Sequence, residues 1–191
     1  MRNLIFALAI LSFAVSLTVA DEGHHHEALT QDQLGSVHFS ISCAPTVQKP
    51  FERGVALLHS FWYEEAEKEF LDIAKNDPQC AMAHWGVAMS LWHQLWNQPD
   101  SATIKRGNTE VKKAKALHPK TEREQTYISA IGSFYAGKKD HDARAAAYSK
   151  SMEQLYQKFP DDREGATFYA LSLLASITKI SRRRSSTGQR G

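Results

Sequence analysis

The chain has 191 residues, with 23 lysines and arginines, 21 acidic residues, nine histidines and two cysteines. A content of 42% hydrophobic and 23% charged residues is that of a globular protein, which excludes a wholly disordered, collagen-like or polytopic membrane chain. The formal charge of +2 includes Arg2 and five basic residues after position 176, and the remainder carries a net charge of −4. A mildly acidic body of this kind is not expected to bind nucleic acid.

Residues 1–20 have the pattern of a secretory signal peptide. A cationic start at Arg2 precedes an uncharged run over 4–20, which ends in small residues before Asp21. We therefore expect an exported protein, periplasmic or secreted, that is cleaved after this run. An uncleaved membrane anchor is the alternative, because a run of 17 residues can just span a bilayer.

Residues 21–46 are expected to form a polar, extended entry segment. Val37, Phe39, Ile41 and Cys43 alternate with polar residues, and this period of two is typical of a strand.

Residues 47–176 show helical periodicity with an internal repeat. Pro78, Pro119 and Pro160 each follow an amphipathic pattern and are spaced 41 residues apart. Because proline removes a backbone donor and clashes with the preceding turn, each one is expected to end a helix.

The first of these units resembles the tetratricopeptide repeat, a helix–turn–helix unit of about 34 residues. Gly54, Ala66, Phe70 and Pro78 fall on the positions at which that family has small, alanine, phenylalanine and proline residues. The resemblance implies an all-α fold, an α-solenoid of about three and a half units over residues 47–176. A four- or five-helix bundle with coincidental proline spacing is the alternative.

The later units carry additional residues between their helices, near 96–100 and 137–140. The segments 54–66 and 77–86 are similar to those of exported bacterial tetratricopeptide-repeat proteins of unassigned biochemical role, which are normally longer. Residues 177–191 leave the pattern and are expected to form a basic, disordered tail. Two interpretations stay open, a truncated or frame-shifted end of a longer repeat protein and a basic arm for anionic surfaces.

The resemblance also implies a concave face lined by the first helix of each unit. Its expected side chains are Phe51, Val55, Leu58 and His59 from the first unit, and Trp85, Met89, Trp92 and His93 from the second. Trp85, Met89, Trp92 and Trp96 recur at helical spacing and form one stripe, which fits either a buried core or a hydrophobic peptide groove.

A groove of this composition predicts a protein-interaction scaffold. Its partner is expected to be a protein or peptide with an apolar or amphipathic segment, and the chain's own residues 34–43 are one such segment. The face lacks the lysine, arginine and asparagine of a peptide-carboxylate clamp.

His59 and His93 occupy equivalent positions in consecutive units, so a periplasmic metal- or cofactor-binding protein is the alternative. A metal site needs three or four ligands and a third is missing, so we expect neither a metal nor a cofactor. The sequence has no GxSxG, HExxH or glycine-rich phosphate loop, and we expect no catalytic activity.

The repeat register indicates that the two cysteines can lie close together. Cys43 precedes the first helix of one unit and Cys80 opens the first helix of the next, so parallel packing would bring both to the same end of the stack. In an oxidising compartment this favours a disulfide between them, with two buried free thiols as the alternative.

Overall fold

The computed structural model describes the backbone of residues 31–187 and the side chains of residues 33–175. The expected signal peptide and the start of the entry segment lie outside the described residues. Within the described part every regular element is helical and no strand occurs, which confirms an all-α chain. The elements are α1 (Gln31–Leu34), the 3-10 turn η1 (Pro45–Val47), α2 (Gln48–His59), α3 (Tyr63–Asn76), α4 (Ala81–Ser90), α5 (Ser101–Ala116), α6 (Glu122–Tyr135), α7 (His141–Lys158) and α8 (Arg163–Thr187).

The helix ends follow the local sequence. Pro78, Pro119 and Pro160 lie two or three residues beyond the ends of α3, α5 and α7, as the spacing predicts. At the starts, Asp100 accepts a hydrogen bond from the Thr103 backbone N–H at α5, and a capping box of Thr121 with Glu124 opens α6.

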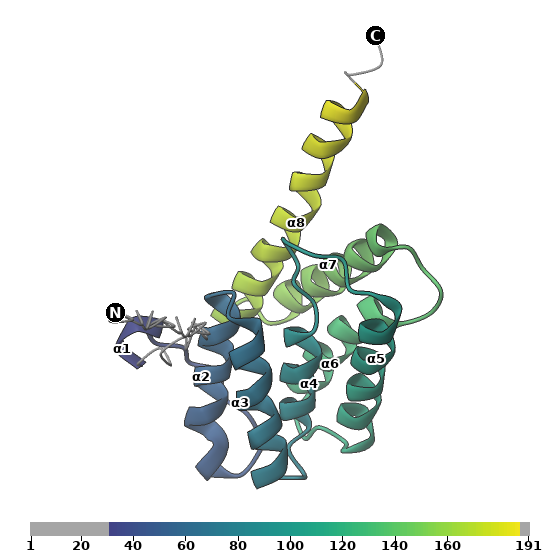
Figure 1. Cartoon of the computed structure of the whole chain (residues 1–191). Coiled ribbons are helices and arrows are strands. Elements are labelled where there is room, and N and C mark those ends of the chain that lie inside the picture. The colour runs from purple at the N-terminus through teal and green to yellow at the C-terminus, as the bar shows by residue number, and fades with distance from the viewer. Residues whose placement is uncertain (1–30, 188–191) are drawn as a thin grey trace, which may run out of the picture.

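Consecutive helices pack against one another along the chain from α2 to α8 (Figure 1). The helices α2, α4 and α6 also contact one another, α2 with α4 and α4 with α6. They therefore form a row, which we call the inner row, with α3, α5 and α7 as the second member of each pair. The helix α8 packs on α7 and then extends beyond the other helices (Figure 1).

Two glycines of the inner row explain how α3 packs between α2 and α4. A Cβ atom placed on Gly54 of α2 would lie 2.7 Å from the Phe70 ring, and one placed on Gly86 of α4 would overlap the same ring. Phe70 is completely buried. Its ring therefore lies directly against the backbone of both inner helices, which only glycine allows at this distance.

The helix α8 runs past the boundary expected at residue 177 and continues to Thr187. The segment 177–187 contains neither proline nor glycine, and Gly188 is the first residue after α8 that favours a helix end. No helix among the described residues is long and apolar enough to cross a bilayer.

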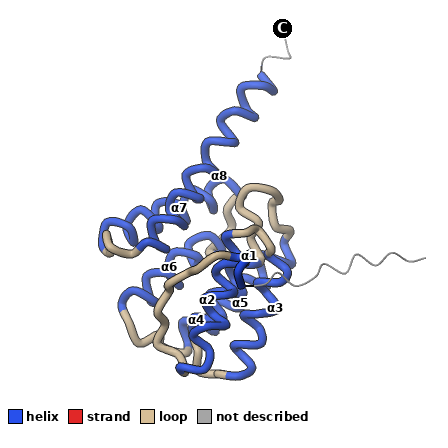
Figure 2. Tube along the Cα trace, turned by 90° about the vertical axis from the view of Figure 1, so that its left-hand side faces the viewer, coloured by secondary structure: helices blue, strands red, loops and turns tan. Residues whose placement is uncertain are grey.

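The strand predicted at 37–43 is also absent. The alternation itself is present: Phe39 is buried, Val37 and Ile41 are half-buried, and His38 and Ser40 are exposed. Residues 31–187 contain no neighbouring strand that could pair with it. Residues 35–44, which we call the strap, instead run as an irregular segment along the helices between α1 and η1 (Figure 2).

Candidate functional site

The strap places one aromatic side chain among those of the inner row. The Phe39 ring lies 5.2 Å from Phe51 of α2, 5.5 Å from Trp85 of α4 and 4.8 Å from Tyr127 of α6, measured between ring centroids. Phe39 has no exposed surface. Each of the three inner helices thus contributes one ring to a slot, which we call the Phe39 slot.

Side chains of α2 bind the main chain of the strap beside this slot. The Gln48 side-chain amide donates to the Phe39 carbonyl at 2.9 Å and accepts from the Ile41 N–H at 3.1 Å. Glu52 accepts from the Phe39 N–H at 3.3 Å. In an extended chain these groups point to the same side, so Gln48 satisfies the strap as a neighbouring strand would.

Arg123 of α6 covers the slot from above. Its guanidinium carbon lies 4.1 Å from the centre of the Phe39 ring, within the range of a cation–π interaction. One terminal nitrogen donates to the Ser40 carbonyl at 3.1 Å. Arg123 therefore contacts both the ring and the main chain of the strap.

Asp162 fixes the position of that guanidinium. Its two carboxylate oxygens accept from Arg123 Nε at 2.7 Å and Nη2 at 3.0 Å, a bidentate pair, and the Tyr127 hydroxyl donates at 2.9 Å. Burial raises the pKa of Asp162, but hydrogen bonds from Arg123, Tyr127 and the Gly165 N–H outweigh it and lower that pKa overall. Asp162 is thus an ionised anchor at neutral pH.

Glu124, one residue further along α6, binds the far end of the strap. Its carboxylate accepts from the Ser42 N–H at 2.6 Å and from the Ser42 hydroxyl at 2.5 Å, while also completing the capping box with Thr121. Glu124 is only 1% exposed. A buried carboxylate of this kind needs such donors, so Ser42 is an integral partner of Glu124.

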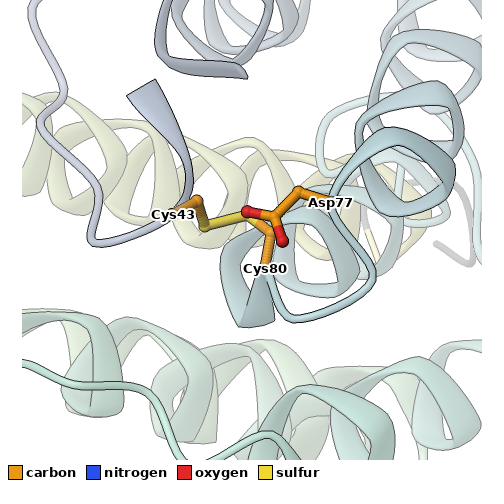
Figure 3. A group of neighbouring side chains, drawn as sticks. All are labelled: Cys43, Asp77 and Cys80. Carbon is orange, nitrogen blue, oxygen red and sulfur yellow. A yellow bond between two sulfur atoms is a disulfide. The ribbon is translucent and has the colours of Figure 1, made fainter. Parts of the chain in front are cut away.

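The end of the strap is covalently attached to Cys80, the N-cap residue of α4. Cys43 and Cys80 form a disulfide, with a Cα–Cα separation of 4.9 Å (Figure 3). Asp77 lies beside the two sulfurs and accepts the Ala44 N–H at 2.8 Å. Among the described residues these three form the one cluster with metal-ligand geometry, but here both sulfurs are bonded to each other.

The eight residues predicted for the concave face differ in their exposure and in their neighbours. Six of them are buried and do not line an open surface: Phe51, Val55, Leu58, Trp85, Met89 and Trp92. Of these, Phe51 and Trp85 contact the strap, whereas Trp92 stacks on Phe134 at 3.8 Å. An open groove of these side chains is therefore wrong, because the strap and the neighbouring helices cover them.

The predicted tryptophan stripe also ends early. The helix α4 ends at Ser90, whose hydroxyl donates to the Gly86 carbonyl, and Leu91 is its C-cap. Trp92 follows the helix and enters the core, while Trp96 lies in the loop before α5 and is 61% exposed.

His59 and His93 engage different partners. His59 Nε2 lies 2.6 Å from the Glu164 carboxylate of α8, and its ring lies 4.8 Å from Phe168. His93 stacks on Tyr63 at 4.3 Å. The two imidazoles therefore have different neighbours, and they do not point into one shared metal-binding site.

A second aromatic cluster lies at the turns that follow α2 and α4, and we call it the turn-end patch. It comprises Phe61, Tyr63, His93 and Trp96, beside an open pocket of about 580 Å³. Phe61 has φ of 61°, in the left-handed region that a bulky residue rarely adopts, and its side chain is 39% exposed. Burial raises the pKa of Tyr63 to about 12.

Comparison with family models, with curated proteins and with solved structures finds no match to this chain.

Several residues of the site were not identified from the sequence: Gln48, Glu52, Asp77, Arg123, Glu124, Tyr127 and Asp162. The Thr121–Glu124 spacing signals a capping box and hence the start of α6. Nothing in the spacing signals that Glu124 also binds Ser42, which is 82 residues away.

Proposed function

We propose that this chain is an exported, tetratricopeptide-like scaffold that binds an extended, apolar or amphipathic segment of a protein partner on its inner row, without catalysing a reaction. The observation that supports this is the strap itself. An extended segment already lies across α2, α4 and α6, held through one aromatic ring and through hydrogen bonds to its main chain. Recognition of main-chain groups plus one side-chain slot is a general mode of peptide binding.

The repeat interpretation is supported by packing. Gly54 and Phe70 make the close helix–helix contact that a small residue and a phenylalanine provide in such a repeat, and Gly86 repeats the contact from the next inner helix. Each pair of helices also contacts the next, as in a stack whose units share a core.

Export is supported by the disulfide between Cys43 and Cys80, because such bonds persist mainly in oxidising compartments. The signal-peptide pattern of residues 1–20 points the same way.

Selection of random peptides by the full chain carrying Phe39→Ala tests the binding proposal. We expect recovered peptides to bind in place of the strap. Arg123→Ala should weaken their binding by about tenfold, because Arg123 contacts both ring and main chain. Arg106→Ala is the matched control, since that residue pairs with Glu67 between α5 and α3 and should leave binding unchanged. If the folded chain retains no peptide with a Kd below about 1 mM, the proposal is wrong.

A further inference from the structure

We infer that the strap occupies the binding site of the partner segment and is displaced when that segment binds. The partner segment carries an aromatic residue followed three positions later by serine or threonine. This inference rests on the proposed function and specifies its ligand. In the strap these two positions are Phe39 and Ser42.

The groups that hold the strap recognise mostly its main chain. The strap N–H groups of Phe39, Ile41, Ser42 and Ala44 and the carbonyls of Phe39 and Ser40 are all bound by side chains of the helical body. Any extended segment offers the same groups, provided that proline does not remove a required N–H. Among the strap side chains, the Phe39 ring contacts the rings of the slot and the Ser42 hydroxyl donates to Glu124, while Val37 and Ile41 pack against the edge of the core.

The charges at the site narrow the partner further. Carboxylates of Glu52, Asp77 and Glu124 accept the strap N–H groups, whereas Arg123 is the base that contacts the ring. An acidic side chain next to the main chain would be repelled by these three carboxylates. Arg123, Lys158 and Arg163 line the cleft on the other side of the strap, so we expect the partner segment to lack acidic side chains only where its N–H groups meet these carboxylates.

The way in which the strap is held permits a partner segment to replace it. Of residues 35–42, only Phe39 is fully buried, and Gly35, Ser36, His38 and Ser40 are exposed. Phe39 is thus the fully buried ring of the strap, beside the half-buried Val37 and Ile41, and an aromatic side chain of the partner can replace it in the slot. The disulfide at Cys43 keeps the strap attached at one end during the exchange.

An open cleft provides room for an incoming segment. It has a volume of about 800 Å³ and lies along the strap, between His38, Ser40 and Ser42 on one side and the turn around Phe159 and Pro160 on the other. An incoming segment can therefore contact the site before the strap leaves it.

The probe is a synthetic peptide with the sequence of residues 36–42, and its control carries alanine at the position of Phe39. Binding is measured by fluorescence anisotropy on the full-length, oxidised chain, as wild type and as Phe39→Ala. We expect the variant to bind the probe about tenfold more tightly than it binds the control peptide, and about tenfold more tightly than the wild type binds the probe, because the tethered strap competes.

Hydrogen exchange of the wild type gives a readout that does not depend on the folding of the variant. With excess probe, the amides of Phe39, Ile41 and Ser42 should exchange faster, because these are the strap groups that lose their acceptors. Amides inside α2, α4 and α6 should keep their protection.

The outcomes separate the two claims. Two outcomes show that the probe does not displace the strap: the folded variant binds the probe while the exchange rates of the wild-type strap amides stay unchanged, or both chains bind the probe with equal affinity. Either outcome overturns this inference and leaves the binding proposal standing. If the folded variant binds no probe, this inference falls, whereas the binding proposal falls only if the selection of random peptides also recovers none. A wild-type dimer in sedimentation, with straps exchanged between copies, would make a second copy the occupant and would also overturn the inference.

Discussion

Two aromatic surfaces of this chain differ in what covers them. At the Phe39 slot, rings from α2, α4 and α6 surround a buried ring of the strap, and polar side chains satisfy its main chain. At the turn-end patch, Phe61 and Trp96 lie 6.0 Å apart with no such cover, and 61% of Trp96 is exposed. The difference lies in the covering segment, because the turn-end patch also has polar neighbours, Ser60, Glu64, Glu65 and Asn97, and its Trp96 stays exposed.

The largest expected effect is a difference in stability between a substitution at the Phe39 slot and one at the turn-end patch. Trp85→Ala should lower the free energy of unfolding by about 4 kcal/mol, because the side chain is buried between Phe39, Phe51 and Tyr127. Trp96→Ala, the matched control, should change it by about 0.5 kcal/mol or less. Urea denaturation followed by circular dichroism measures both, and equal effects would contradict the assignment of core and surface.

Asp162→Asn should cost roughly 3 kcal/mol at neutral pH, because it removes the bidentate partner of the half-buried Arg123. Because the folded pKa of Asp162 is lowered, its stabilisation is complete above the unfolded-state pKa of about 4 and is lost as the pH falls through the folded pKa. Denaturation across this acid range should show a flatter pH dependence for the variant. Parallel pH curves for the two proteins would refute the role of Asp162.

Gly86→Ala should destabilise the chain by about 2 kcal/mol, although alanine is the better helix former, since the new methyl group overlaps the Phe70 ring. Gly132→Ala is the control within α6, where the nearest atom, on Val111, lies 3.1 Å from the added carbon. Thermal unfolding should show the larger loss at position 86. A reversed order would mean that Phe70 does not lie against α4 as described.

The turn-end patch carries the smallest expected effect, and it has the opposite sign. Phe61→Gly should stabilise the chain by up to about 1 kcal/mol by relieving the left-handed backbone. His118→Gly, at φ of 51°, is the matched control and should stabilise by a similar amount. If only the control is stabilised, the exposed Phe61 ring contributes contacts that offset its strain.

Much of the helical framework could be predicted from the sequence, because its signals are local. The prolines at 78, 119 and 160 predicted three helix ends, and the longer connections near 96–100 and 137–140 are loops in the structure. The helical periodicity of residues 47–176 also predicted an all-helical chain.

The site was predicted only in part, because its contacts join distant segments. The sequence offers residues 34–43 as one candidate occupant of the predicted concave face, because that face is expected to take an apolar or amphipathic segment. The open groove was wrong, since burial of Phe51 and Trp85 depends on where the strap lies. The roles of Gln48 and Arg123 had no signal, because a polar residue on a helix surface does not show which distant main chain it binds.

The most direct test of the account is a structure of the full-length Phe39→Ala chain with the peptide of residues 36–42. We predict that the peptide phenylalanine occupies the Phe39 slot, with its ring beside Phe51 and Tyr127 and beneath Arg123. A peptide bound at the turn-end patch, between Phe61 and Trp96, would contradict the claim that the inner row is the binding surface.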